Sequence, residues 1–354
     1  MTQTMPAIVH YEHKDKAVEI RDVAVPEIGE DDVLLEVRSV SVCGSDVHMW
    51  RNALGHKPRV PVILGHEFSG VIARAGRRVS GFKEGDRVAS ETAAEICGAC
   101  MLCRTGLYNL CPHRKGFGHY ADGAMTRFAR VPVRCLHHLP DRLPFRRAAL
   151  LEPCSVAYHC AAVNTRVRPG DFVVVLGPGP IGLLSLQVAR LQGAGTVFIS
   201  GVEEDAPRLE IAVRQLGADR AINASREEAV EVVKSFSDGL GADIIIDAVG
   251  ISATLKQSIE MVRPGGQITK VGWGPAPVGF SLDPLVAKGA TLQGSFSHNY
   301  KTWERVIELV TDSKINVDPL ISRVAPLEGW HEAFAKMEER VEVKAVLTPN
   351  GPVE

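Results

Sequence analysis

The sequence predicts an α/β protein with a mostly-β part and a doubly wound parallel sheet. Residues 7–40 carry short apolar runs broken by Pro26, Gly29 and the pair Asp31-Asp32, which is typical of short strands and turns. From Asp171 onward, β-branched runs alternate with helical patterns, and this alternation indicates a parallel sheet covered by helices. The chain has 354 residues, a length for which two domains are expected.

The composition of the chain argues against some classes of binding partner. The formal net charge is −2, with 45% hydrophobic and 23% charged residues, so neither nucleic acid nor an anionic membrane is expected as a partner. Residues 1–6 contain no basic segment followed by an apolar one. Glycines and prolines interrupt the most apolar stretch, residues 172–191. We therefore expect a cytoplasmic protein.

The N-terminal part supplies side chains that can bind a divalent metal ion. They are Cys43, His66, Glu67 and, further along, Glu152, and Ser45 and His48 lie within about one turn of Cys43. A single cysteine is more often a small buried hydrophobe. Zinc, however, accepts sulfur, nitrogen and oxygen donors, and a catalytic zinc keeps one position open for water or substrate. The combination therefore favours an open zinc site.

A second cysteine pattern follows in a segment with little periodicity. Cys97, Cys100, Cys103 and Cys111 form C-x2-C-x2-C-x7-C. Four thiolates at this spacing can close a tetrahedral structural zinc site. The alternatives are a disulfide-bearing loop, which a reducing compartment disfavours, and an iron–sulfur cluster.

A dinucleotide-binding pattern opens the second part. The β-branched run 172–176 leads into Gly177-Pro178-Gly179-Pro180-Ile181-Gly182, which is G-x-G-x-x-G, and an apolar helical pattern follows. A strand at 196–200 and a helix at 208–216 complete a βαβ unit. Such glycines let the backbone approach a pyrophosphate at the helix N-terminus.

The alternation continues toward the C-terminus. The predicted elements are strands at 243–250, 267–272, 292–296 and 344–347, helices at 254–262, 303–310 and 327–337, and a turn at 264–266. Ligands of such sheets bind outside the carboxyl ends of the strands.

Taken in order, the motifs resemble those of the zinc-containing medium-chain dehydrogenases, in the branch of sorbitol (polyol) and L-threonine dehydrogenases. The resemblance runs from end to end and rests on 43–48, Gly65-His66-Glu67, the four cysteines, Leu151-Glu152-Pro153 and 177–182. It implies a GroES-like catalytic domain over 1–155, with a structural-zinc lobe at about 95–113. It also implies a Rossmann domain over 156–295 and a return to the catalytic domain over 296–354. A homotetramer or homodimer is expected by the same analogy.

The resemblance also implies roles for the metal-site residues. Cys43, His66 and Glu152 would bind the catalytic zinc, and Glu67 would bind it directly, through water, or tune the site from outside. An ion pair within the chain is the alternative for Glu67. Ser45 and His48 would relay the alcohol proton to solvent. The alternatives are a turn hydroxyl for Ser45 and a satisfied core or surface histidine for His48.

NAD is favoured as cofactor, with NADP as the alternative. The predicted cofactor-binding residues are Gly177, Gly179, Pro180, Ile181, Gly182, Gly201, Glu203, Arg208, Val249, Val271 and Phe296. Gly201 stands where NAD-specific members carry an acid. Glu203 can supply the carboxylate instead, whereas Arg208 can bind a 2′-phosphate.

The expected reaction is hydride transfer between a polyol or secondary alcohol and NAD(P), giving the ketone. Residues 294–300 match the family segment that reaches the substrate, but Ser297-His298 stands where sorbitol dehydrogenases typically carry an arginine. No clear basic group for a threonine carboxylate is found. The alternatives are an L-threonine 3-dehydrogenase and a non-catalytic NAD-binding member.

Overall fold

The structure, a computed structural model, describes residues 3–353, and its contacts divide the chain into two units. Unit 1 consists of the described residues up to Glu152, Asn299–Ser313, and the described residues from Leu320 onward. Unit 2 consists of Pro153–His298 and Lys314–Pro319. Each unit therefore contains segments that are far apart in the sequence. Among residues 3–353, no helix is both long and apolar enough to cross a bilayer.

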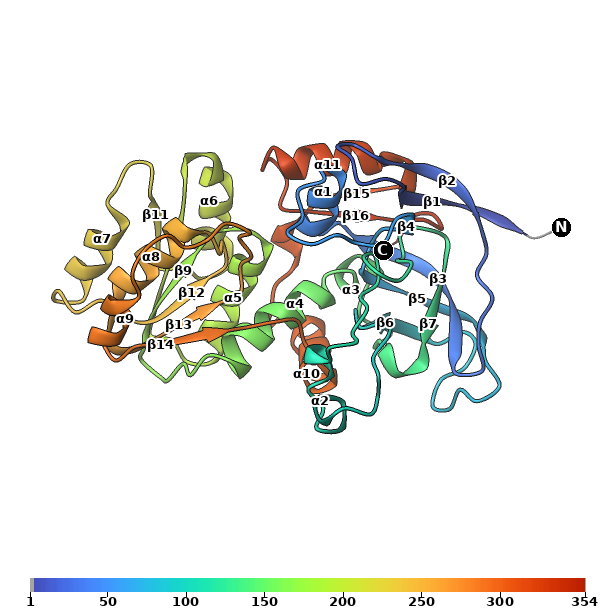
Figure 1. Cartoon of the computed structure of the whole chain (residues 1–354), viewed down its shortest axis with the longest axis horizontal. Coiled ribbons are helices and arrows are strands. Elements are labelled where there is room, and N and C mark those ends of the chain that lie inside the picture. Colours follow the sequence, from blue (N-terminus) through green and yellow to red (C-terminus); the bar gives the residue numbers. More distant parts are fainter. Residues whose placement is uncertain (1–2, 354) are drawn as a thin grey trace. The chain divides into compact units, whose positions relative to one another are not determined.

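Unit 1 is mostly β, as the sequence predicts (Figure 1). One sheet has the order β2-β1-β4, and a larger one has the order β15-β16-β3-β5-β6-β8, with β7 also paired to β3. The strands are β1 (Thr4–His10), β2 (Val18–Ala24), β3 (Asp32–Ser41), β4 (Val62–Ile63), β5 (Glu67–Ala75), β6 (Arg87–Ser90), β7 (Phe128–Pro132), β8 (Leu136–His138), β15 (Ile321–Ala325) and β16 (Lys344–Leu347). The strand expected at 344–347 is confirmed as β16.

The helices of unit 1 are short apart from α10 and α11. They are α1 (Gly44–Trp50), α2 (Met101–Arg104), η1 (Tyr108–Leu110), η2 (Val133–Cys135), α3 (Phe145–Ala148), α10 (Tyr300–Thr311), η6 (Leu327–Gly329) and α11 (Trp330–Glu338). Trp50 of α1 contacts Trp330 and Phe334 of α11 edge-to-face. This aromatic contact fixes the helix that follows Cys43. Two elements cross the boundary between the units, α4 (Leu151–Tyr158) and η5 (Asp318–Leu320).

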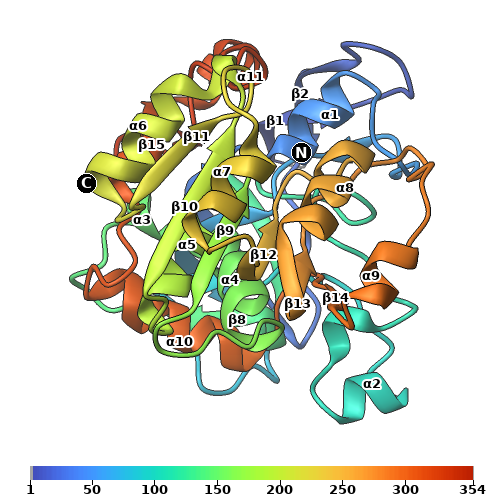
Figure 2. The same ribbon diagram turned by 90° about the vertical axis from the view of Figure 1, so that its left-hand side faces the viewer.

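Unit 2 contains the predicted doubly wound parallel sheet. Its strands lie in the order β11-β10-β9-β12-β13-β14, all parallel, and Figure 2 shows them in this order. The strands are β9 (Phe172–Leu176), β10 (Thr196–Gly201), β11 (Arg220–Asn223), β12 (Ala242–Asp247), β13 (Val262–Lys270) and β14 (Thr291–Gly294). The helices are η3 (His159–Val163), α5 (Pro180–Leu191), η4 (Glu203–Asp205), α6 (Ala206–Gln215), α7 (Ala229–Phe236), α8 (Ser252–Met261) and α9 (Asp283–Ala287). All five residues of β9 are buried, which explains its continuous apolar run.

Several boundaries in unit 2 differ from the sequence prediction. The strands predicted to end at 250 and 272 end at Asp247 and Lys270. The turn expected at 264–266 lies inside β13, which begins at Val262. The register between β12 and β13 shifts between Ala242 and Ile244, so the extra residues of β13 are taken up there as a bulge. The last strand of the sheet ends at Gly294, two residues before the predicted end.

Candidate active site

Cys43 and His66 come together because strands β3 and β5 pair antiparallel, with Ser41 opposite Glu67. Cys43 follows β3 at the N-terminus of α1, and His66 immediately precedes β5. One donor atom each from Cys43, His66 and Glu67 lies within 4.8 Å of the others. The structure therefore groups a thiol, an imidazole and a carboxylate at one point of unit 1.

Asp46, which the sequence analysis did not single out, ties the two ligand-bearing segments together. Its fully buried carboxylate accepts hydrogen bonds from the backbone N–H of Cys43 at 2.9 Å and of Gly65 at 3.4 Å. Its Oδ1 lies 3.9 Å from Nδ1 of His66. The signal in the sequence was the spacing of Cys43 and Asp46, which is that of a helix-capping residue and its N3 partner.

The donor set suits a divalent cation. Burial alone lowers the pKa of His66, but the Cys43 thiolate and the Asp46 and Glu152 carboxylates more than offset this and raise it to about 10. Nδ1 of His66 is buried and has no hydrogen-bond partner among the described residues. Anionic sulfur and oxygen beside an imidazole match the ligand chemistry of zinc.

Glu152 lies close to this group without joining it. It is the second residue of α4 and is 7% exposed. Its charge acts on both His66 and Glu67, yet it is not among the three residues whose donor atoms lie within 4.8 Å. Of the four predicted ligands, three are therefore gathered and the fourth is a close neighbour.

Glu67 forms a buried ion pair, the alternative that the sequence left open. Its Oε2 accepts hydrogen bonds from Nζ of Lys344 and from Oγ of Ser41. Nζ of Lys344 also donates to the Val42 carbonyl at 2.7 Å. Lys344 belongs to β16, and no local pattern in the sequence pointed to it.

The two predicted relay residues lie on α1. Oγ of Ser45 is buried and makes no hydrogen bond within the part of the chain that the structure describes. His48 is exposed one turn further along the same helix. A buried hydroxyl followed by an exposed imidazole is an arrangement that can pass a proton toward solvent.

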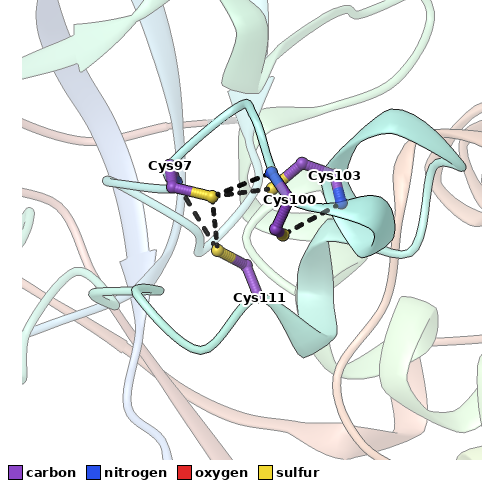
Figure 3. A group of neighbouring side chains, drawn as sticks. All are labelled: Cys97, Cys100, Cys103 and Cys111. Carbon is purple, nitrogen blue, oxygen red and sulfur yellow. Dashed lines mark hydrogen bonds between the residues drawn. The ribbon is translucent and has the colours of Figure 1, made fainter.

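The four-cysteine lobe gathers its sulfurs around one point (Figure 3). Sγ of Cys97 lies 3.9 Å from that of Cys103 and 3.7 Å from that of Cys111. With Zn–S bonds of about 2.3 Å, tetrahedral ligands stand about 3.8 Å apart, so the spacing fits zinc. Backbone N–H groups of Cys100 and Ala99 lower the pKa of Cys97 to about 6, which favours the thiolate.

The glycine-rich loop of unit 2 has an open side. Gly177 adopts φ +95°, which favours glycine, and α5 begins after Gly179. A Cβ on Gly182 would overlap the Gly177 carbonyl, whereas a Cβ on Gly179 would meet nothing within 4 Å. Val249, Val271 and Phe296 come after β12, β13 and β14, at the same carboxyl edge of the sheet. Dinucleotides bind at this edge of such sheets, beside the glycine-rich loop.

Strand β10 ends in Gly201, without the acidic side chain that binds the adenosine ribose in NAD-specific members of the family. Gly201 is packed by Pro178 and Asp205, and Asp205 is buried. Nη1 of Arg208 lies 3.7 Å from Oδ1 of Asp205. The carboxylate of Glu203 is held by Arg226 and Asn223, and Arg226 is a residue that the sequence analysis missed.

Comparison with known proteins agrees with this geometry. Residues 29–141 match the family of the alcohol dehydrogenase GroES-like domain, and residues 180–312 match the family of zinc-binding dehydrogenases. The sorbitol dehydrogenase of Halalkalibacterium halodurans is 38% identical over 98% of this chain and 99% of its own length. The D-arabitol-phosphate dehydrogenase of Enterococcus avium is 37% identical over 93% of each.

The fold of the chain is also similar to that of a solved structure. A zinc-binding dehydrogenase from Sinorhizobium meliloti, bound to NADP, has a TM-score of 0.90 and 29% identity, covering 98% of this chain and 100% of that one. The chain therefore belongs to the zinc-binding alcohol dehydrogenases of the medium-chain dehydrogenase family. The predicted fold class, with a GroES-like part and a Rossmann sheet, and the predicted class of enzyme are confirmed.

Proposed function

We propose that this enzyme transfers hydride between a polyol or secondary alcohol and NAD(P), giving the ketone, with NAD favoured. The observation that carries the proposal is the grouping of Cys43, His66 and Glu67 in a chain that also has the open glycine loop at 177–182. The likeness to a sorbitol dehydrogenase supports a polyol as substrate. A threonine substrate lacks a matching basic group among the predicted site residues.

In this proposal Cys43, His66 and Glu152 hold the catalytic zinc, and the four cysteines of the lobe hold a structural one. A zinc ion bound there supplies Lewis acidity that lowers the pKa of an alcohol. Ser45 takes up the proton of the alcohol, and the exposed His48 passes it to solvent. Glu67 is held by Lys344 and Ser41 and does not bind the zinc; its charge contributes to the electrostatic potential at the zinc site.

An absorbance assay tests the proposal. NADH formation is followed at alkaline pH with sorbitol, xylitol, galactitol, D-arabitol phosphate, L-threonine and simple secondary alcohols, each with and without a chelator. The expected result is turnover of an unphosphorylated polyol or a secondary alcohol that the chelator abolishes. Turnover of L-threonine alone would establish the other branch of the family. NADH binding without turnover of any of these compounds would favour a non-catalytic member.

We also propose self-association, with a homodimer as the smallest assembly and a homotetramer of two dimers. β14 is an edge strand of the sheet, and all four of its residues are exposed. Val286 and Trp273 of the same unit are exposed by 77% and 74%. An exposed edge beside apolar side chains suits pairing with a second copy about a two-fold axis.

Light scattering tests this self-association. The measured mass should be at least twice that of one chain, and Val286→Glu should lower the measured mass. A monomer in the native protein would contradict the proposal.

The proposed compartment is the cytoplasm. All eight cysteines are free thiols, and four of them gather at the lobe. Free thiols persist in reducing compartments. Fractionation that recovers the active enzyme outside the cytoplasm would contradict this.

A further inference from the structure

The carboxyl end of β10 cannot carry the acid that usually binds the adenosine ribose. Gly201 lies opposite Asn223 in the parallel ladder of β10 and β11. A Cβ at position 201 would lie 2.8 Å from Cγ of Pro178 and 3.1 Å from Cβ of Asp205. The pyrrolidine ring of Pro178, which belongs to the glycine-rich loop, therefore occupies the space of the missing side chain. Ribose recognition must therefore come from neighbouring residues.

Glu203 lies two residues after Gly201, and its carboxylate is paired with the Arg226 guanidinium. Nε of Arg226 donates to Oε2 of Glu203 at 2.6 Å, Nη2 donates to Oε1, and Nδ2 of Asn223 donates to Oε2 at 2.7 Å. Two carboxylate oxygens offer about four acceptor positions, so one remains on Oε1. That position can accept a hydrogen bond from a ribose hydroxyl.

Donors for a phosphate remain on the loop after β11. Within residues 3–353, Nη1 of Arg226 makes no hydrogen bond, and the side chain is 69% exposed. Oγ of Ser225 accepts from the Glu203 N–H at 3.1 Å, which leaves its proton free to donate. A guanidinium and a hydroxyl are groups that commonly bind phosphate oxygens.

We propose that Arg226 and Ser225 form a site for the 2′-phosphate of NADP(H), beside a ribose site on Glu203, so that the chain binds both dinucleotides. This rests on the proposed function, since it requires a dinucleotide on the 177–182 loop. The Glu203–Arg226 ion pair offsets the repulsion that Glu203 would otherwise exert on the phosphate. Glu204, which is exposed, still opposes the phosphate, so NAD(H) remains the tighter ligand.

Binding of adenosine fragments to the intact protein tests the inference without turnover. Calorimetry would measure the Kd of 5′-AMP, 2′,5′-ADP, NADH and NADPH for the native chain, Arg226→Gln and Glu203→Gln. Arg214→Gln, which removes an exposed arginine paired with Glu210 on α6, is the matched control. Circular dichroism shows that each variant is folded.

Arg226→Gln should weaken 2′,5′-ADP and NADPH about tenfold or more, and change 5′-AMP less than about threefold. Glu203→Gln should weaken NADH and tighten 2′,5′-ADP, and Arg214→Gln should change neither. The inference is overturned if Arg226→Gln leaves 2′,5′-ADP unchanged, or if the native chain binds NADH but neither NADPH nor 2′,5′-ADP. A native chain that binds no dinucleotide at all would instead overturn the proposed function, and this inference with it.

Discussion

Lys344 and Glu67, 277 residues apart in the sequence, form an ion pair in which each side chain is 1% exposed. The pair joins β16, near the C-terminus, to β5, which follows His66, a proposed zinc ligand. Burial raises the pKa of Glu67 and the Lys344 charge opposes this rise, so the carboxylate depends on its partner to stay ionised. Strand β16 thus sets the charge of Glu67 beside the proposed zinc site.

Replacing Lys344 with methionine should destabilise unit 1. The variant keeps the length of the side chain but leaves Glu67 buried without a cation, which costs about 3–5 kcal/mol of unfolding free energy. Urea unfolding followed by circular dichroism measures the loss. Lys344→Met combined with Glu67→Gln should recover most of it, and equal losses in the single and double variants would contradict the role given to the pair.

Cys103→Ser should remove the structural zinc alone. The serine hydroxyl is a poor substitute for a thiolate, so elemental analysis should find one zinc per chain fewer than in the native protein. The thermal unfolding midpoint should fall by several degrees, because metal binding contributes folding free energy. Iron in the native protein would instead favour the cluster alternative, and a mass change on reduction would favour a disulfide.

Two alanine substitutions in the glycine loop should separate binding from folding. Gly179→Ala places a methyl group in open space at an ordinary φ of −70°, so the fold should be retained while NADH binds about tenfold more weakly. Gly182→Ala drives its methyl into the Gly177 carbonyl and should lower the unfolding midpoint. Fluorescence titration with NADH and thermal unfolding measure the two effects. Unchanged NADH binding by Gly179→Ala would show that the open side of the loop does not face the cofactor.

His159 should make stability depend on pH. Burial, helped by neighbouring His298, lowers the pKa of His159 from 6.5 to about 4. The unfolded chain takes up this proton near pH 6.5 and the folded chain only near pH 4. This part of the stability is therefore complete above pH 6.5 and is lost as the pH falls toward 4, by ~3 kcal/mol.

The measurement is the free energy of unfolding at several pH values between 4.5 and 7.5, compared between the native chain and His159→Phe. The stability of the native chain relative to His159→Phe should fall toward low pH, because phenylalanine takes up no proton. His113→Gln, at an exposed histidine, should follow the native curve. Parallel curves for His159→Phe and the native chain would contradict the assignment.

Features that lie close together in the sequence could be predicted from it. The four lobe cysteines fall within fifteen residues, and the glycine loop lies directly between its strand and its helix. In both cases local spacing determines the geometry. The turn predicted at 264–266 falls inside β13, where the register with β12 jumps from Val262 to Gln267 and Gly265 adopts φ +68°. The local sequence shows this irregularity, but not that Val262 before it already pairs with β12.

Interactions between distant residues could not be predicted. The sequence around Glu67 does not show whether this residue binds a metal ion or Lys344. The lysine reaches Glu67 only because β3 pairs with both β5 and β16. The sequence offered Arg208 as the phosphate-binding cation, because it follows Gly201 closely. The structure gives Arg208 a neighbour in Asp205 and places Arg226 beside Glu203 instead. Register between neighbouring strands, rather than distance along the chain, decides which cation faces which acid.

If a zinc site on Cys43 drives alcohol oxidation, Cys43→Ser should lose NADH formation. The assay uses the best alcohol substrate at alkaline pH, with Cys160→Ser, a buried thiol of unit 2, as control. We expect Cys43→Ser to form NADH more than about 100-fold more slowly, with NADH binding and the fold of unit 2 retained, and the control to change little. A rate for Cys43→Ser equal to that of the native enzyme would contradict this expectation.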